Sequence, residues 1–139
     1  MEFKIRSVVL PLVIINIALF FIQILVPGFT ESFILVGSDI FSRPWILLTS
    51  MFLHGGGYHL LVNMYALILF GGILEQKIGP KRLLLLYFAS GLIAAFLSSF
   101  FYARALGASG AIYGVIGGLI MIMPQLRLLF LFFIPMPLW

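Results

Sequence analysis

The stretch LLLLYFASGLIAAFLSSFFY, residues 83–102, decides which kind of fold this sequence can form. It has no charged side chain, and it has the length of roughly 20 residues that a helix needs to cross a lipid bilayer. Small side chains recur along it at four-residue spacing, in the rows Ser90, Ala94, Ser98 and Gly91, Ala95, Ser99. Small residues at this spacing let two helix backbones approach closely within lipid. The stretch therefore predicts a membrane helix packed tightly against a neighbour.

The neighbour is predicted by a second segment rich in small residues, residues 109–123. Gly110, Gly114 and Gly118 are also four residues apart, so they form a row on one face of a helix. We expect this row to lie against the small residues of 83–102.

The composition of the whole chain excludes a water-soluble domain. Of 139 residues, 63% are hydrophobic and 9% are charged, whereas soluble domains contain about 25% charged residues. In water, such a chain would expose large apolar patches. The net charge of +4 comes from scattered basic residues, which fit a lipid bilayer and not a nucleic-acid partner. The sequence has no cysteine, which excludes a disulfide framework and a thiolate site.

The apolar pattern predicts an all-α, polytopic bundle of transmembrane helices that forms one domain over residues 1–139. The expected spans are residues 8–26, 58–73, 83–102, 109–123 and 128–139. The first is longer than the roughly 7–15 apolar residues of a secretory signal, so we expect it to stay uncleaved. The last would be only about 18 Å long as a helix, so we expect the chain to end inside a span.

Basic residues predict the orientation of this multi-pass bundle. On one side of the membrane we expect six of them, namely Lys4, Arg6, Lys77, Lys81, Arg82 and Arg127. Only Arg43 and Arg104 are expected on the other side. The N-terminus is therefore predicted to be cytoplasmic, in what we expect to be the plasma membrane of a prokaryote. The long external connection, residues 28–53, is predicted to have structure of its own and to lie partly in the interface.

The polar side chains gather at the external face in this topology. His59 and Asn63 open the span that begins near residue 58, and because they are four residues apart they share one helix face. His54 precedes them, with three glycines following it. Ser109 opens the span 109–123 within the sequence GASG. On their own, His59 and Asn63 could simply form hydrogen bonds between helices.

The length of the span 109–123 places its start below the membrane surface. Fifteen residues give about 22 Å of helix, and the hydrocarbon core is about 30 Å thick. Residues 103–108 should therefore dip into the membrane, where irregular backbone is tolerated only inside protein or beside a wet cavity. We expect a small water-accessible cavity at this loop.

The available side chains exclude several chemistries. No H-E-x-x-H motif is present, and no carboxylate lies between Asp39 and Glu75, so a zinc-protease site is not expected. No two acidic residues pair within a span, which excludes a paired-aspartate mechanism. We therefore expect no metal and no cofactor. Attack by a serine remains, and it needs a base and hydrogen-bond donors for an oxyanion. Ser109, at the start of a helix, would have free backbone N–H groups nearby.

The segments WILLTSMFLHGGGYHLLVNM, GGILEQKIGPKRLLLLYFASGL and GASGAIYG together resemble the rhomboid family of intramembrane serine proteases. The resemblance covers about residues 43–135. It rests on a His, then H-x-x-x-N on the second helix, then G-x-S-G opening the fourth. It implies a six-helix bundle of which about five spans are present.

The resemblance assigns roles residue by residue. Ser109 would be the nucleophile, and His59 and Asn63 would line the oxyanion site with the Ser109 backbone N–H. Gly107 would shape the loop before the serine. The other two positions it assigns are Tyr113, which would pack against the catalytic His, and His54, which would be structural.

Two positions depart from the family pattern. The family's base is a His on the sixth helix, and this chain carries only His54 and His59, neither of which has that role. In the first loop Trp45 is followed by Ile46, where the family has Arg.

The expected function is therefore cleavage of single-pass transmembrane substrates, with the general base missing from these 139 residues. The alternative is a non-catalytic relative that binds transmembrane clients. A small channel or carrier is a third hypothesis, with little support because the spans hold no chain of acids and bases.

Overall fold

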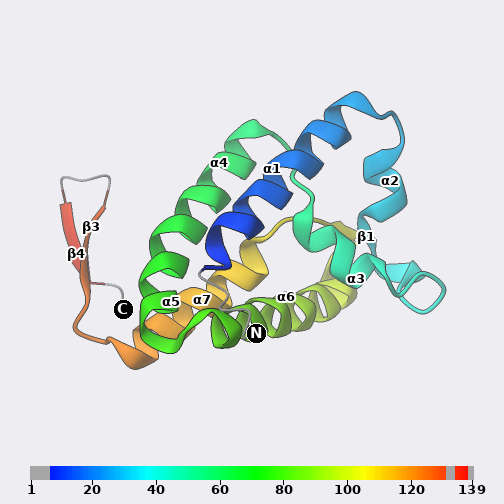
Figure 1. Ribbon diagram of the computed structural model, residues 1–139. Helices are drawn as coiled ribbons and strands as arrows, with labels where there is room; N and C mark the ends of the chain where they lie inside the picture. The colour runs from blue at the N-terminus through cyan, green and yellow to red at the C-terminus, as the bar shows by residue number, and fades with distance from the viewer. Residues whose placement is uncertain (1–6, 131–133, 138–139) are drawn as a thin grey trace, which may run out of the picture.

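A computed structural model describes residues 7–130 and 134–137 of the chain, and these residues form a bundle of helices (Figure 1). The long helices are α1 (Val9–Leu25), the continuous helix formed by α4 (Gly57–Ala66), η3 (Leu67–Gly71) and α5 (Gly72–Ile78), then α6 (Pro80–Phe101) and α7 (Ser109–Ile122). Each corresponds to one of the first four predicted spans. The all-α bundle is confirmed.

The second span is longer than predicted, because its helix continues to Ile78 where the hydropathy pattern suggested an end near residue 73. The helix ends at Gly79, whose φ of 84° is left-handed and therefore suits glycine. Pro80 then opens α6 at a first-turn position, where the missing N–H costs no hydrogen bond. Backbone chemistry, and not polarity, sets this boundary.

Among the described residues, two helices are long and apolar enough to cross a membrane. They are residues 57–78, in which an 18-residue stretch has a mean hydropathy of 1.6, and Pro80–Phe101, in which such a stretch has 2.1. Only 28% of the first stretch and 22% of the second are buried inside the protein. Their apolar side chains therefore face outward, as lipid contact requires and as the core helix of a soluble protein would not allow. The helices α1 and α7 are apolar too, but shorter.

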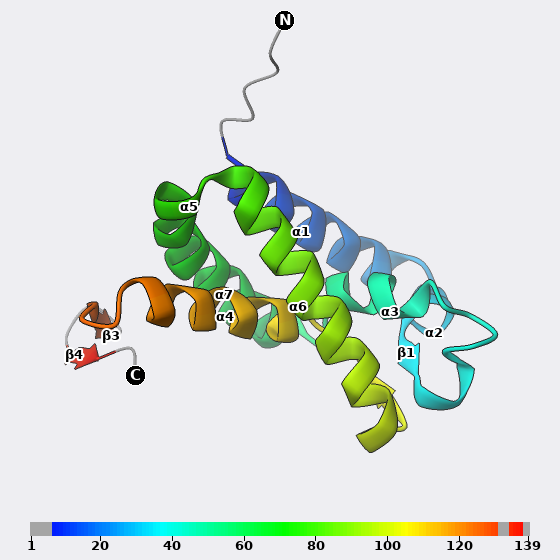
Figure 2. The same cartoon turned by 90° about the horizontal axis from the view of Figure 1, so that it is seen from below.

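Close contact between α6 and α7 confirms the predicted packing of small residues, and Figure 2 shows the two helices crossing. A Cβ added at Gly110 would lie 2.5 Å from the Ala94 Cβ, and one added at Gly114 would collide with Ser90. The Ser90 hydroxyl donates within α6 to the Leu86 carbonyl at 2.6 Å, and its oxygen lies 3.2 Å from the Ala111 carbonyl of α7. Glycine in α7 and small residues in α6 are therefore required by the distance between the backbones.

The connection 28–53 has structure of its own, as predicted. It contains α2 (Phe29–Phe33), β1 (Leu35–Val36), η1 (Gly37–Asp39), α3 (Ile46–Thr49) and η2 (Ser50–Phe52). The sequence did not predict β1, which pairs antiparallel with β2 (Arg104–Ala105). This pairing joins the connection to the loop that leads into α7.

At the other end of the bundle, Glu75 of α5 caps the start of α1. Its carboxylate accepts the Val8 backbone N–H at 2.6 Å and the Ser7 hydroxyl at 2.7 Å. The first N–H groups of a helix have no partner within it, and a carboxylate there is favoured by the helix dipole. The cap therefore fixes the start of α1 against α5.

The prediction of a fifth helical span over 128–139 is wrong for the residues that the structure describes there. Residues Arg127–Phe130 (β3) and Ile134–Pro137 (β4) form an antiparallel hairpin, and the rest of the predicted span lies outside the described residues. Pro135 and Pro137 lack backbone N–H donors and would interrupt a helix. The hairpin stands apart from the helices in Figures 1 and 2.

Candidate active site

Ser109 is the first residue of α7 and is half-buried at the end of the loop 103–108. The loop is held from the side, because the Gly107 N–H donates to the Ser50 carbonyl at 2.9 Å. Ala108 is fully buried beneath it. The serine is therefore placed by a helix start and by an anchored loop, as GASG suggested.

His59 lies in the first turn of α4 and approaches the same point. A Cβ added at Gly107 would lie 3.0 Å from His59 Nε2 and 3.7 Å from Ser109 Oγ. The two predicted polar groups are therefore neighbours on either side of this glycine, although within the described residues the Ser109 hydroxyl forms no direct hydrogen bond with His59.

A hydrogen bond determines which ring nitrogen of His59 carries the proton. The Gly55 N–H donates to His59 Nδ1 at 3.2 Å, which favours the tautomer that has no proton on Nδ1. In a neutral imidazole the proton is then on Nε2. His59 therefore presents an N–H donor near Gly107, and an oxyanion needs such a donor.

Asn63 lies one turn further along α4 and is buried. Its Nδ2 atom has no hydrogen-bond partner among the described residues. A buried amide without a partner costs free energy. Asn63 therefore has a donor available for a ligand, and its predicted role at the oxyanion site stays a prediction.

His54 packs against His59 with the ring centroids 5.1 Å apart and the rings tilted by 64°. Only 2% of the residue is exposed, and neither ring nitrogen has a partner in the described part of the chain. Burial, reinforced by the neighbouring His59, lowers the pKa of His54 to about 4. The ring is therefore neutral at neutral pH. This fits the structural role expected from the resemblance, which remains a prediction.

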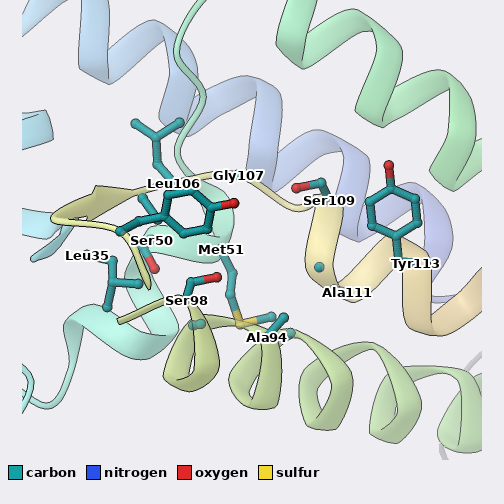
Figure 3. Close-up of a pocket in the computed structure, with 15 residues that line it drawn as sticks. Leu35, Ser50, Met51, Ala94, Ser98, Leu106, Gly107, Ser109, Ala111 and Tyr113 are labelled. Atoms are coloured by element: carbon teal, nitrogen blue, oxygen red, sulfur yellow. The ribbon is translucent and has the colours of Figure 1, made fainter. Parts of the chain in front are cut away.

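Tyr113 lies one turn after Ser109 on α7 and is 73% exposed. Its ring extends from α7 beside the serine in Figure 3. Its expected packing against a catalytic His is thus untested by the described residues.

A cavity of about 370 Å³ opens beside Ser109, where the sequence predicted one near residues 103–108. Figure 3 shows it between α6, the start of α7 and the loop at Leu106 and Gly107. The volume is enough for several water molecules, each of which occupies about 30 Å³ in the liquid. Its polar lining includes Ser50 and Ser98.

Sequence reasoning missed two contributors to the site. Ser50 supplies both a cavity wall and the carbonyl that holds Gly107. Gln23 of α1 binds the backbone of His54. A carboxamide within the apolar segment 8–26 was a signal that could have identified Gln23, because polar groups in a span are costly without a partner. Within the described residues, no three His, Cys, Asp or Glu side chains gather as a metal site would need.

The sequence can be compared with known proteins. Those similar to the chain include three proteins of Arabidopsis thaliana. The chain is 42% identical over 81 residues to "RHOMBOID-like protein 6, mitochondrial", covering 57% of this chain and 26% of that protein. It is 47% identical over 75 residues to "RHOMBOID-like protein 2", covering 52% and 24%. It is 35% identical over 78 residues to "Inactive RHOMBOID-like protein 8", covering 55% and 22%. The chain thus spans less than a third of the length of each of these relatives.

The family described as "Rhomboid domain" matches residues 42–139, a region that runs from the structured connection through Ser109 and beyond α7. This match covers well over half of the chain and includes the histidines, the asparagine and the serine described above. The helical bundle and the match agree, and the chain belongs to the rhomboid family.

Proposed function

We propose that this protein is an intramembrane serine endopeptidase that cleaves transmembrane protein substrates, with Ser109 as the nucleophile. The observation that carries the proposal is that Ser109 Oγ and His59 Nε2 both lie close to Gly107. The rhomboid family is a family of serine proteases, and this geometry provides a nucleophile beside an N–H donor.

The chemistry follows from these positions. Ser109 Oγ attacks the carbonyl carbon of the substrate peptide, and the hydroxyl proton passes to a base. The carbonyl oxygen becomes an oxyanion, which accepts hydrogen bonds from His59 Nε2–H, Asn63 Nδ2 and the backbone N–H groups at the start of α7. The tetrahedral intermediate then breaks its C–N bond, the amine leaves with a proton, and water hydrolyses the acyl-enzyme ester.

The base is assigned to neither histidine of the chain. His59 uses Nδ1 to accept the Gly55 N–H, which leaves its proton on Nε2, near Gly107. His54 is buried behind His59. The resemblance places the base on a sixth helix, so cleavage must be measured on the full-length protein.

A second function, binding of transmembrane clients without cleavage, is favoured by one observation. A relative named "Inactive RHOMBOID-like protein 8" is 35% identical over 78 residues. The two functions share the bundle and differ in the need for the Ser109 hydroxyl.

The membrane is the setting for both functions, since the rhomboid family is membrane-embedded and two helices of this chain are long and apolar enough to span a bilayer. We propose a multi-pass topology with a cytoplasmic N-terminus and single-pass substrates. The plasma membrane of a prokaryote stays a prediction.

The test is cleavage by the full-length protein in proteoliposomes, with a panel of single-pass transmembrane segments as substrates. We expect cleavage by the wild type and none by Ser109→Ala, because the nucleophile is removed. A fluorophosphonate probe should label the wild type at Ser109. Stable binding of the same segments by both proteins without any cleavage would favour the client-binding function.

A further inference from the structure

A carboxamide of α1 reaches the backbone beside the candidate active site. Gln23 and Asn16 are the two amide side chains in an otherwise apolar helix. Gln23 Nε2 donates to the His54 carbonyl at 3.1 Å, and the His54 N–H donates to Gln23 Oε1 at 2.9 Å. Both polar atoms of the side chain thus bind the backbone of one residue, which fixes that residue relative to α1.

The carboxamide has no remaining donor. Its second N–H is directed to Thr30 Oγ1 of α2, at 3.0 Å from Nε2. A half-buried side chain with all of its donors paired is held in one orientation. Gln23 therefore connects α1 to Thr30 of α2 and to the backbone of His54 through three hydrogen bonds.

The segment that Gln23 holds contacts both sides of the site. We call residues 50–55 the bridging segment. At one end, the Ser50 carbonyl accepts the N–H of Gly107, two residues before Ser109. At the other end, the Gly55 N–H donates to His59 Nδ1. Gln23 binds His54, the residue directly before Gly55.

We propose that Gln23 is a positioning residue, which holds the bridging segment so that the Gly55 N–H keeps His59 in the Nε2–H form with its donor toward Ser109. Without the carboxamide, two backbone groups of His54 lose their partners and the segment can shift. His59 Nδ1 then loses its fixed donor, and the ring can turn or change tautomer. The effect on catalysis rests on the proposed function, whereas the effect on the His59 proton does not.

The kinetic test uses the full-length protein in proteoliposomes. Gln23→Leu removes all three hydrogen bonds and keeps an apolar side chain of similar size, and Thr30→Val is the matched control that removes only the bond to α2. We expect Gln23→Leu to lower kcat by about 10- to 100-fold with KM nearly unchanged, because a misplaced catalytic group can cost about 100-fold. Thr30→Val should retain the wild-type kcat.

A double substitution separates positioning from general loss of stability. If Gln23 acts through His59, then Gln23→Leu should add little to the defect of His59→Ala, since residues that act as a unit are not additive. A full and multiplicative further loss would overturn the proposal. Where Gln23→Leu fails to fold, Gln23→Glu is used, because it keeps the acceptor and the size but loses the donor at neutral pH.

A spectroscopic test decides the same question without any cleavage. Imidazole ¹⁵N chemical shifts of the full-length protein in nanodiscs report the tautomer of His59. We expect the Nε2–H form in the wild type and a mixture of forms in the Gln23 variant. An unchanged tautomer together with an unchanged kcat would overturn the proposal. If the wild type does not cleave any substrate, the proposed function fails, and the tautomer comparison alone decides the role of Gln23.

Discussion

Gly107 and His59 are so close that only glycine fits at position 107. A Cβ added there would lie 2.8 Å from His59 Cε1 and 3.0 Å from Nε2, inside normal contact distance. The backbone gives a second reason, because the φ of Gly107 is 120°, a conformation that residues with a side chain rarely adopt. Two independent constraints therefore require glycine at the point where His59 faces Ser109.

Replacing this glycine should damage catalysis more than stability. In Gly107→Ala the new methyl group would displace the His59 ring, so we expect cleavage by the full-length protein to fall by about 100-fold. Backbone strain should lower the free energy of unfolding by about 1–3 kcal/mol. Both are measurable, by kinetics in proteoliposomes and by thermal denaturation in detergent.

The matched control is Gly117→Ala in α7. A Cβ there meets nothing within 4 Å, and alanine is favoured over glycine within a helix by about 0.5–1 kcal/mol. Its activity should remain at the wild-type level. Equal losses of activity in both variants would show that the loss in Gly107→Ala does not come from contact with His59.

Asn63→Ala should weaken cleavage without abolishing it. The side chain is buried, and its Nδ2 has no partner in the part of the chain that the structure describes. The loss of one oxyanion donor typically costs about 10²–10³ in kcat. KM should stay close to the wild-type value, because the hydrogen bond forms to the charge that develops during the reaction. An unchanged kcat would exclude Asn63 from the oxyanion site.

The sequence predicted the parts of the site that depend on helix periodicity. His59 and Asn63 follow from four-residue spacing, and Ser109 follows from a helix start after glycines. The contact between the α6 and α7 rows was predicted in the same way, and the structure confirms it at Gly110 and Ala94.

What the sequence did not predict depends on contacts between residues distant in the chain. The pairing of Leu35 with Ala105 and the bond from Gln23 to His54 span long stretches of sequence. Neither has a local periodic pattern. The prediction of a helix over 128–139 was wrong at the described residues because hydropathy alone cannot distinguish an apolar helix from an apolar hairpin. Pro135 and Pro137 also disfavour a helix there.

Acid should destabilise the protein through His54. Its pKa is lowered from 6.5 to about 4 by burial, so between these values the unfolded chain binds a proton that the folded chain does not. Stability should therefore rise with pH across this window and be lost as the pH falls from about 6.5 toward about 4. Thermal denaturation of wild type and His54→Phe should show a shallower pH dependence in the variant, which leaves the neighbouring His59 unaltered. Identical pH dependences would contradict the assignment to His54.

Glu75→Ala should lower stability by removing the cap of α1. The Val8 N–H and the Ser7 hydroxyl would both lose their acceptor, and the loss of a helix cap typically costs about 0.5–2 kcal/mol. The exposed neighbour gives the control, Gln76→Ala, which should leave the melting temperature unchanged. A Glu75→Ala protein as stable as the control would show that the cap contributes nothing in the membrane.

Labelling from the two sides of the membrane should test the proposed topology. The pairing of β1 with β2 joins residues 35–36 to residues 104–105, and the Glu75 cap joins the start of α1 to the end of α5. The basic residues predict that the end with the Glu75 cap is cytoplasmic.

Ser38 and Gln76 are exposed at the two ends, and the sequence has no cysteine of its own. Single cysteines at these positions should therefore react with a membrane-impermeant thiol reagent from opposite sides, Gln76→Cys from the cytoplasm and Ser38→Cys from outside. Reaction of both from one side would contradict the multi-pass arrangement, and a reversal of the two sides would contradict the cytoplasmic N-terminus alone.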